Sequence, residues 1–305
     1  MGRAPQPAAE CLSRVTSRGG DSEGMRSTSV VVGVVEQGPD CADLRPAARR
    51  LASVPMESPG TSPQTVLSPE GGATPWADTV VIVRVFNEAP VVGGVISELI
   101  SAGLSVIAVD DASTDESAAE IEKAGAFRVS HPINLGAGGA LQTGFEAALQ
   151  LSDAQFIACF DADGQHQLAD LLGMIEKIRQ GYDVVLGSRF LEDAGPTQMS
   201  WPRRVILRTA AKLLNRRGGV KLTDAHNGLR VVARHVAADV RLSYAGMAYA
   251  SQLEEFLTRP EYRITEFPVH ILYTEYSRSK GQPLLNSVNI LAEVAAHRIT
   301  EWGRR

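Results

Sequence analysis

Short apolar runs alternate with amphipathic stretches through the middle of the chain. Runs rich in Val, Ile and Ala are each followed by a segment whose apolar residues recur at helical spacing. This alternation predicts parallel strands joined by helices, in an α/β fold built on a doubly wound, mostly parallel sheet. The predicted strands are 79–86, 104–109, 126–130, 156–160 and 183–186, and the predicted helices are 90–102, 116–124, 138–151 and 168–180.

Residues 1 to about 76 lack this alternation. They are rich in Pro, Gly, Ser, Ala and Arg, and 55–75 is nearly free of large apolar side chains. A segment with so little to bury stays disordered. We therefore expect a disordered tail over 1–76, followed by a single domain over 77–305. Met25 and Met56 are alternative start residues, in which case part of this tail is an artefact of the assigned start.

The pattern changes again after the last predicted strand. The segment 201–217 combines apolar residues with Lys and Arg, which is typical of a basic amphipathic helix. Such a helix either lies on a membrane surface or turns its apolar side to the protein core, and the same pattern serves both. The segment 284–302 raises the same choice.

Composition narrows the class of protein. The net charge of −5 implies no strongly basic face, which argues against a nucleic-acid partner. The three cysteines have no metal-ligand spacing, and Cys159 lies in a predicted strand, where a small buried thiol is usual. A reducing, cytosolic setting fits these features. No run approaches the roughly 20 apolar residues that cross a bilayer, so we expect a soluble or peripheral protein.

The strand predicted at 156–160 leads into Asp161-Ala162-Asp163-Gly164-Gln165-His166. Two carboxylates one residue apart repel each other unless a cation lies between them, and their oxygens suit Mg²⁺ or Mn²⁺. The carboxyl ends of strands are also where α/β sheets bind ligands. This run therefore predicts a divalent cation held against a diphosphate. The alternative is a turn in which an Asp caps the next helix.

Acidic residues also follow the first two predicted strands. Glu88 comes after the first strand, and Asp110 and Asp111 come at the end of the second. Because parallel strands share one carboxyl edge, these groups are expected to converge with those at 161 and 163. Convergent carboxylates need a function that offsets their repulsion. Asp115, in contrast, is better explained as a helix cap.

Glycines open the helix predicted at 138–151, in the run Asn134-Leu135-Gly136-Ala137-Gly138-Gly139. They permit close approach of the backbone to a ligand. Their spacing is not that of a dinucleotide-binding fingerprint. The run is either a ligand loop or the turn that starts the helix.

Taken together, these motifs resemble family-2 glycosyltransferases of the GT-A fold. The similarity is to the branch that includes dolichyl-phosphate mannose synthase and bacterial polyprenyl-phosphate glycosyltransferases. It covers about residues 78–240, with the motifs in family order and spacing. The matching elements are Phe86-Asn87-Glu88, Asp110 to Asp115, Asn134-Leu135-Gly136, Asp161 to His166 and Gly187-Ser188-Arg189-Phe190.

The resemblance implies that the N-terminal half holds a nucleotide sugar, with Glu88 and Asp111 near the base and ribose. It also implies that Asp161, Asp163 and Gln165 surround a Mg²⁺ or Mn²⁺ ion on the donor diphosphate. His166 either touches the ligand or is a residue of the helix start. The residues expected to bind the nucleotide sugar are Phe86, Glu88, Asp110, Asp111, Asn134, Gly136, Asp161, Arg278 and Lys280.

On the acceptor side, the resemblance assigns Arg189 to the acceptor phosphate, which a guanidinium matches well. The run Thr223 to Arg230 resembles a second family element. It makes Arg230 another anion-binding candidate, and Asp224 either orients Arg230 or neighbouring groups, or forms a turn. The expected catalytic set is Asp163, Arg189, Asp224 and Arg230. The loop 273–282 is expected to fold over the diphosphate through Arg278 and Lys280, unless it is only a solvated basic loop.

The acidic residues that could act as a general base bear on the type of acceptor. A phosphate oxygen is already ionised and needs no general base, whereas a sugar hydroxyl needs one. Relatives that glycosylate hydroxyls usually carry an acidic pair near 223–230, and here Asp224 stands alone with His226 beside it. This departure favours a phosphate acceptor.

We therefore expect a metal-dependent, inverting glycosyltransferase that moves a sugar from a nucleotide diphosphate to a polyprenyl phosphate. It is expected to be cytoplasmic and peripheral at the inner face of the membrane, reached through its basic helices or a small membrane-protein partner. One alternative is a transferase that acts on a saccharide hydroxyl in cell-envelope polysaccharide synthesis. Alternatives of another class are a nucleotidyltransferase and a nucleotide-sugar-binding protein.

Overall fold

A computed structural model describes residues 29–31, 74–191, 222–224, 227–242, 248–272 and 276. Its centre is an eight-stranded sheet with the strand order β1-β4-β3-β2-β5-β7-β6-β8. The strands are β1 (Ser29–Val31), β2 (Thr79–Val85), β3 (Ser105–Asp110), β4 (Phe127–Ser130), β5 (Phe156–Asp161), β6 (Val184–Ser188), β7 (Arg230–Ala233) and β8 (Ile264–Pro268). The helices are α2 (Ala89–Ser101), α3 (Ser117–Ala124), α4 (Gly136–Leu151), α5 (Leu168–Ile178), α7 (Arg234–Asp239) and α8 (Ala248–Leu257).

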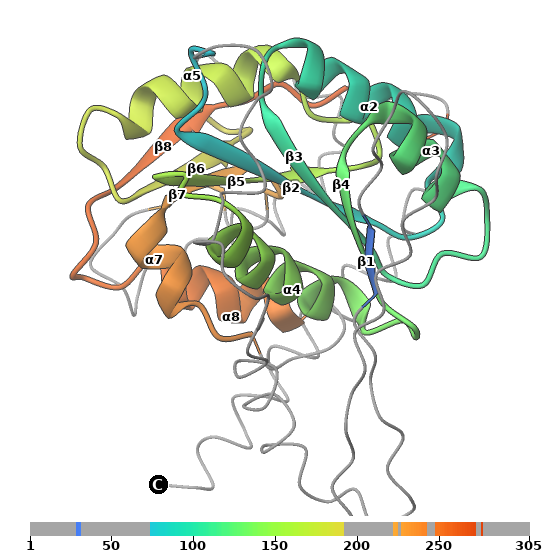
Figure 1. Cartoon of the computed structure of the whole chain (residues 1–305). Helices are drawn as coiled ribbons and strands as arrows, with labels where there is room; N and C mark the ends of the chain where they lie inside the picture. The colour runs from blue at the N-terminus through green and yellow to red at the C-terminus, as the bar shows by residue number, and fades with distance from the viewer. Residues whose placement is uncertain are drawn as a thin grey trace, which may run out of the picture.

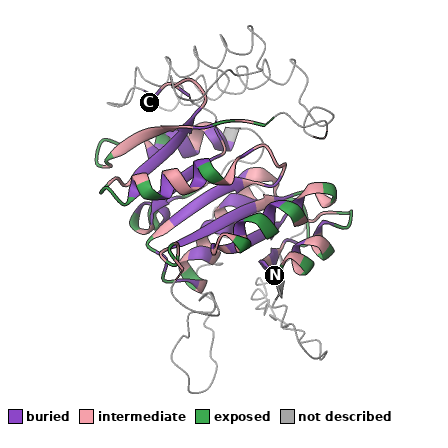
Figure 2. Cartoon of the chain, turned by 90° about the horizontal axis from the view of Figure 1, so that it is seen from above, coloured by how far each residue is buried: buried purple, intermediate pink, exposed green. Residues whose placement is uncertain are grey.

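Helices cover both faces of the sheet (Figure 1). Helices α2, α3 and α5 lie on one face, and α4, α7 and α8 lie on the other. Alternate residues of β2 face opposite layers, so that Val80 and Ile82 join the core under α4 while Val81 and Val83 join the core under α2 and α5. Figure 2 shows the central strands buried between these layers. The predicted doubly wound α/β fold is confirmed.

One strand runs against the others. β7 pairs antiparallel with both β5 and β6, whereas the remaining strand pairs are parallel. Its first residue, Arg230, lies opposite Cys159 near the carboxyl end of β5 and opposite Leu186 in β6. Because of this direction, the start of β7 and the residues before it arrive at the same sheet edge as the ends of β2, β3 and β5.

The element boundaries differ slightly from those predicted. Helix α4 begins at Gly136 instead of residue 138, and β6 extends to Ser188. Within the segment expected to be a tail, β1 pairs with the outer side of β4, and the Thr74 hydroxyl donates to the Gly103 carbonyl (2.9 Å). The rest of 1–73 lies outside the described residues, so the disordered tail stays a prediction.

The segments expected to form basic amphipathic helices, 201–217 and 284–302, also lie outside the described residues. Among the helices that the structure describes, none has both the length and the apolar character needed to span a membrane. Cys159 is a buried free thiol, as predicted.

Candidate active site

The strand register brings acidic residues of β3 and β5 to one edge of the sheet, on either side of the end of β2. Asp110 pairs with Val85 across β3 and β2, and Asp161 pairs with Arg84 across β5 and β2. Phe86, the residue after β2, is 46% exposed although it is a large apolar side chain. Residues that lie far apart in sequence therefore line a continuous edge made by β3, β2 and β5.

Both carboxylate oxygens of Asp161 are engaged within the protein. Its Oδ1 forms an ion pair with Arg84, and its Oδ2 lies 3.1 Å from Nε2 of His166. Burial acts to raise the pKa of Asp161, but Arg84 and the hydrogen bond with His166 outweigh burial and hold the pKa well below its usual range. Asp161 is thus a fixed anion at the end of β5.

Two further residues hold this ion pair in place. Arg84 Nη1 donates to the Tyr249 hydroxyl (2.6 Å), and its guanidinium lies 5.5 Å from the centre of the same ring. The His166 ring is buried and meets Phe160 edge-on, with ring centres 5.4 Å apart. Arg84 and Tyr249 were not predicted. A charged residue inside the apolar run of β2 is the signal that could have pointed to Arg84.

Asp163 is in a different electrostatic state. The backbone N–H of Gln165 donates to its Oδ1 (3.0 Å), and the Gln165 side-chain amide donates to its Oδ2 (2.8 Å). Burial raises the pKa of Asp163, and the negative charges of Asp161 and Glu88 raise it further. Within the described residues no Lys or Arg pairs with it. Asp163 is therefore the carboxylate at this edge whose charge is least compensated.

Gly228 packs directly against Asp161. A Cβ atom added at Gly228 would lie 1.9 Å from Asp161 Oδ2, far inside contact distance. The carboxylate cannot easily move away, because Arg84 and His166 hold it on the other side. Gly228 is thus required because the backbone at this position lies too close to Asp161 to leave room for a side chain.

Replacing Gly228 with Ala is expected to lower the free energy of unfolding by about 1–3 kcal/mol, since overpacking must displace Asp161 or the backbone. Transfer activity is expected to fall by about a hundredfold, because a small displacement at the reacting edge is costly. Urea unfolding and initial rates measure the two effects. Gly94→Ala is the control, because nothing lies within 4 Å of its added Cβ. Equal, small effects for both variants would contradict this account.

Asp110 and Asp111 are both buried at the end of β3. Oδ1 of Asp110 accepts from the Ser113 backbone N–H (3.0 Å). Oδ1 of Asp111 accepts from the Leu135 backbone N–H (2.8 Å), which ties the end of β3 to the start of α4. Asn134 Oδ1 accepts from the Gly136 N–H (2.9 Å) and so helps to start α4.

The loops after β2 and β3 are joined to each other. Asn87 Oδ1 accepts from the Thr114 backbone N–H (2.8 Å), and Asn87 and Ala112 both have positive φ, at 55° and 60°. Asp115 accepts from the backbone N–H groups of Ala89 (3.1 Å) and Ser117 (3.0 Å), as the helix-cap prediction required. These contacts fix the backbone that presents Glu88.

Glu88 also receives a contact from the far end of the chain. The Tyr276 hydroxyl donates to Glu88 Oε2 (2.7 Å), and the backbone N–H of Leu272 donates to the Gln165 carbonyl (2.9 Å). The segment after β8 therefore reaches both the loop after β5 and the loop after β2. Arg278 and Lys280, predicted to act from this segment, lie outside the described residues, as does His226.

A second cluster lies at the ends of β6 and β7. Arg189 forms a two-point pair with Asp224, with Nε to Oδ2 at 2.6 Å and Nη2 to Oδ1 at 2.7 Å, and the Asp224 side chain is fully buried. The Arg189 backbone N–H also donates to Asp224 (3.1 Å). Glu266 of β8 accepts from the backbone N–H groups of Thr223 and Asp224. Asp224 thus orients Arg189.

Beneath this cluster lies Glu254 of α8, which was not predicted. Its side chain is buried, and Oε2 has no hydrogen-bond partner among the described residues. Burial raises the pKa of Glu254 well above its usual value, in spite of the opposing charge of Arg230, which is also buried. No sequence signal pointed to this position, because the sequence does not show which of the adjacent Glu254 and Glu255 is buried.

The pKa of Glu254 is higher in the folded protein than in the unfolded chain. The contribution of this side chain to stability is therefore greatest below the pKa of the unfolded chain, and it is lost as the pH rises through the pKa of the folded protein. Glu254→Gln is therefore expected to gain stability relative to the wild type as pH rises from 5 to 8, at about 1.4 kcal/mol for each unit of pKa elevation. Urea unfolding at both pH values measures the difference. The exposed neighbour Glu255→Gln should show no such trend. A pH-independent difference for Glu254→Gln would refute this prediction.

Comparison with known proteins adds to this geometry. The sequence profile of glycosyl transferase family 2 matches residues 80–241. An uncharacterized protein of Methanocaldococcus jannaschii is 30% identical over 223 residues, which cover 72% of this chain and 91% of that protein. The polyprenol monophosphomannose synthase of Mycolicibacterium smegmatis is 28% identical over 264 residues, which cover 82% of this chain and 96% of that protein.

A solved structure shares the architecture. The glucosyl-3-phosphoglycerate synthase of Mycobacterium tuberculosis, in complex with Mn²⁺, UDP and phosphoglyceric acid, has a TM-score of 0.52 at 17% identity, covering 72% of this chain and 77% of that chain. This likeness concerns the fold, and it confirms the predicted GT-A architecture. The profile spans β2 to α7 and includes most of the site described above. The chain therefore belongs to glycosyl transferase family 2 and is a glycosyltransferase.

Proposed function

We propose that this enzyme moves a sugar from a nucleotide diphosphate donor to a polyprenyl phosphate, with Mg²⁺ or Mn²⁺ at Asp163 and with inversion at the anomeric carbon. The observation that carries the proposal is the charge of Asp163, which is the least compensated at this edge of the sheet. Burial and the charges of Asp161 and Glu88 raise its pKa, and within the described residues no basic side chain pairs with it. A cation at this position would remove the repulsion.

The residues present fit a cation held mainly by Asp163. Gln165 lies beside it and has an amide oxygen to offer, whereas both oxygens of Asp161 are engaged by Arg84 and His166. In the described part of the chain no three acidic, His or Cys side chains could enclose an ion alone. This suits Mg²⁺, which keeps several waters and is shared with substrate phosphates. When bound, the cation neutralises negative charge on the leaving nucleoside diphosphate.

The donor is assigned to the edge formed by β3, β2 and β5. The exposed ring of Phe86 offers an apolar surface to a base, and Glu88, Asp110 and Asp111 offer carboxylates to base and ribose groups. The loop at Asn134 and Gly136 borders this edge through the Leu135 hydrogen bond to Asp111. The position of these residues along one edge of the sheet supports the assignment.

The acceptor is assigned to the cluster around Arg189 and Arg230. A phosphate oxygen of the acceptor attacks the anomeric carbon while the bond from that carbon to the donor diphosphate breaks, so one displacement inverts the configuration. Asp224 accepts two hydrogen bonds from the Arg189 guanidinium, which suits an orienting role better than that of a general base. An already ionised phosphate requires no such base.

Peripheral attachment at the cytosolic membrane face belongs to the same proposal. It rests on the nature of the acceptor, on the basic segment 201–217, and on the segment 284–302, which Arg304 and Arg305 follow in the sequence. A relative of similar length is named as a polyprenol monophosphomannose synthase, which supports a lipid phosphate as acceptor. A small membrane protein is the alternative means of attachment.

Incubation with radiolabelled nucleotide sugars and a polyprenyl phosphate tests the proposal. We expect label to enter the organic phase as a lipid that mild acid hydrolyses, and we expect chelation of divalent cations to abolish this transfer. Label that stays in a water-soluble glycan would instead support a saccharide hydroxyl as acceptor. If the protein binds these donors but transfers no sugar from them, the result would support a nucleotide-sugar-binding protein instead.

A further inference from the structure

A buried chain of hydrogen bonds lies behind the proposed donor edge. His131, directly after β4, places its Nδ1 2.7 Å from Asp111 Oδ1 and its Nε2 2.9 Å from the Thr143 hydroxyl of α4. The side chains of His131 and Asp111 are 2% and 4% exposed. The backbone N–H of His131 also donates to the Asp110 carbonyl (2.9 Å), which holds residue 131 beside the end of β3.

The chain of hydrogen bonds has a partner for both ring nitrogens of His131. Nδ1–H donates to Asp111, because a carboxylate oxygen accepts, and Nε2 pairs with the Thr143 hydroxyl, which can donate or accept. In this arrangement each atom of the chain has a partner, and the orientation of the ring is set from both sides. The ring therefore links the first carboxylate after β3 to a turn of α4 that lies far from it in sequence.

The two carboxylate oxygens of Asp111 differ in their hydrogen bonds. Oδ1 accepts from both His131 and the Leu135 backbone N–H, whereas Oδ2 accepts no hydrogen bond within the described part of the chain. The Asp111 side chain is not fully enclosed, because 4% of its surface is exposed at the end of β3. The network thus fixes the rotation of the carboxylate and leaves one oxygen for a ligand.

We propose that His131 is a positioning residue for the nucleotide donor, acting through Asp111 and anchored by Thr143. This inference rests on the proposed function, because it assumes that Asp111 meets the base or ribose. His131 does not itself reach the donor. Its effect on donor binding comes from holding the carboxylate in one orientation before the donor arrives, which removes an ordering cost from binding.

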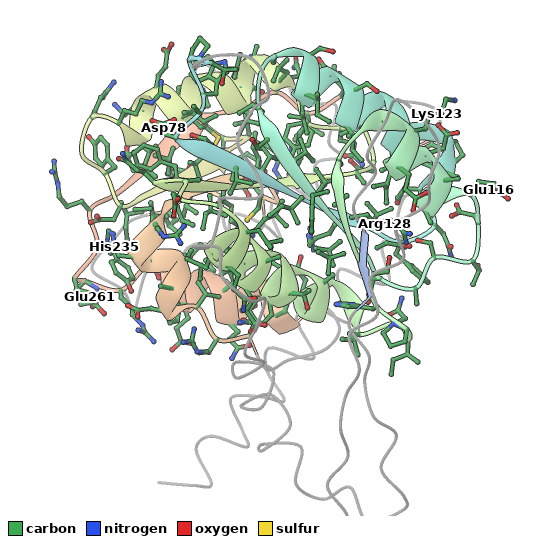
Figure 3. All side chains as sticks on the ribbon, in the orientation of Figure 1. Asp78, Glu116, Lys123, Arg128, His235 and Glu261 are labelled. Atoms are coloured by element: carbon green, nitrogen blue, oxygen red, sulfur yellow. The ribbon has the colours of Figure 1, made fainter. Side chains whose placement is uncertain are left out.

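Four variants test this role. His131→Phe keeps a planar ring but removes both nitrogens, Thr143→Val removes the hydroxyl, and Thr143→Ser retains it. His235→Phe is the matched control, because this His is 60% exposed on α7 and lies at the opposite side of the molecule from Arg128 of β4 (Figure 3). For each variant, calorimetric titration gives the Kd of UDP, GDP, CDP and dTDP with Mn²⁺, and initial rates give kcat and the KM of donor and acceptor.

We expect His131→Phe to raise the nucleotide Kd and donor KM by about tenfold or more, the range for hydrogen bonds to charged groups, with kcat and acceptor KM within about twofold. Thr143→Val should raise donor KM by about threefold, and Thr143→Ser should restore it. If His131→Phe does not fold, the two Thr143 variants decide.

A folded His131→Phe protein with the wild-type donor KM would overturn the inference, as would equal donor KM values for Thr143→Val and Thr143→Ser. Equal losses in donor KM, acceptor KM and kcat would also overturn it, because they indicate a general structural role. A wild-type protein that binds none of the four nucleotides would overturn the proposed function itself, and the inference with it.

Discussion

Asp163→Asn is expected to reduce kcat by about a thousandfold, as loss of a charged group at a developing transition-state charge does. Asn keeps the shape of the side chain, and its one oxygen can still accept from the Gln165 backbone N–H. Its NH₂ group replaces the oxygen that accepts from the Gln165 side chain, and it offers no charged oxygen to a cation. The fold should not suffer, because the substitution removes the repulsion from Asp161 and Glu88 that raises the pKa of Asp163. Thermal unfolding of Asp163→Asn should therefore occur at or above the wild-type temperature.

The effect on cation binding can be measured apart from activity. Electron paramagnetic resonance of Mn²⁺ in the presence of UDP or GDP should show an affinity lowered by at least about tenfold in Asp163→Asn. Asp239→Asn, at an exposed position on α7, is the matched control and should leave both quantities unchanged. A folded Asp163→Asn protein with full turnover would remove the cation from the mechanism.

Arg189→Lys is expected to lose the two-point pair with Asp224, because an ammonium cannot present two parallel N–H groups. We expect acceptor KM to rise by about a hundredfold, since the phosphate loses a correctly oriented guanidinium. The free energy of unfolding should fall by about 3 kcal/mol, because Asp224 is fully buried and its charge is left poorly compensated. Urea unfolding and acceptor titrations measure the two effects.

The chain contains a matched control for this substitution. Arg179 pairs with Asp78 through the same atoms, Nε to Oδ2 at 2.9 Å and Nη2 to Oδ1 at 2.6 Å, but both side chains are about a third exposed. Asp78 precedes β2, at the edge of the sheet opposite to the site (Figure 3). Arg179→Lys should cost less than about 1 kcal/mol and leave acceptor KM unchanged. Similar losses for the two variants would show that Arg189 has no special role.

The alternation of apolar runs and amphipathic segments was sufficient to predict β2 to β6 and α2 to α5 in order. Those elements are specified locally, by side-chain periodicity and by the turn residues between them. The direction of β7 was not predictable in this way. Its four residues, Arg230 to Ala233, pair with β5 and β6 through contacts that are distant in sequence, and a short apolar run carries no information on strand direction.

The residues of the candidate site also fall into a group that could be predicted from the sequence and a group that could not. Glu88, Asp111, Asp161 and Asp163 were predicted because each follows a strand, and the carboxyl edge of a parallel sheet is common to all. Their partners were not predicted. Arg84 comes from β2, His131 from the loop after β4, and Tyr249 and Glu254 from α8, and their roles depend on which side chain the fold places opposite them.

Anomalous diffraction at the manganese edge, from a crystal grown with Mn²⁺ and the nucleotide that the enzyme binds best, shows whether a cation binds at Asp163. We expect one manganese peak about 2.0–2.6 Å from an Asp163 oxygen, with the nucleotide diphosphate completing its coordination. A nucleotide bound elsewhere, or no manganese beside Asp163 in a crystal that contains the nucleotide, would contradict it.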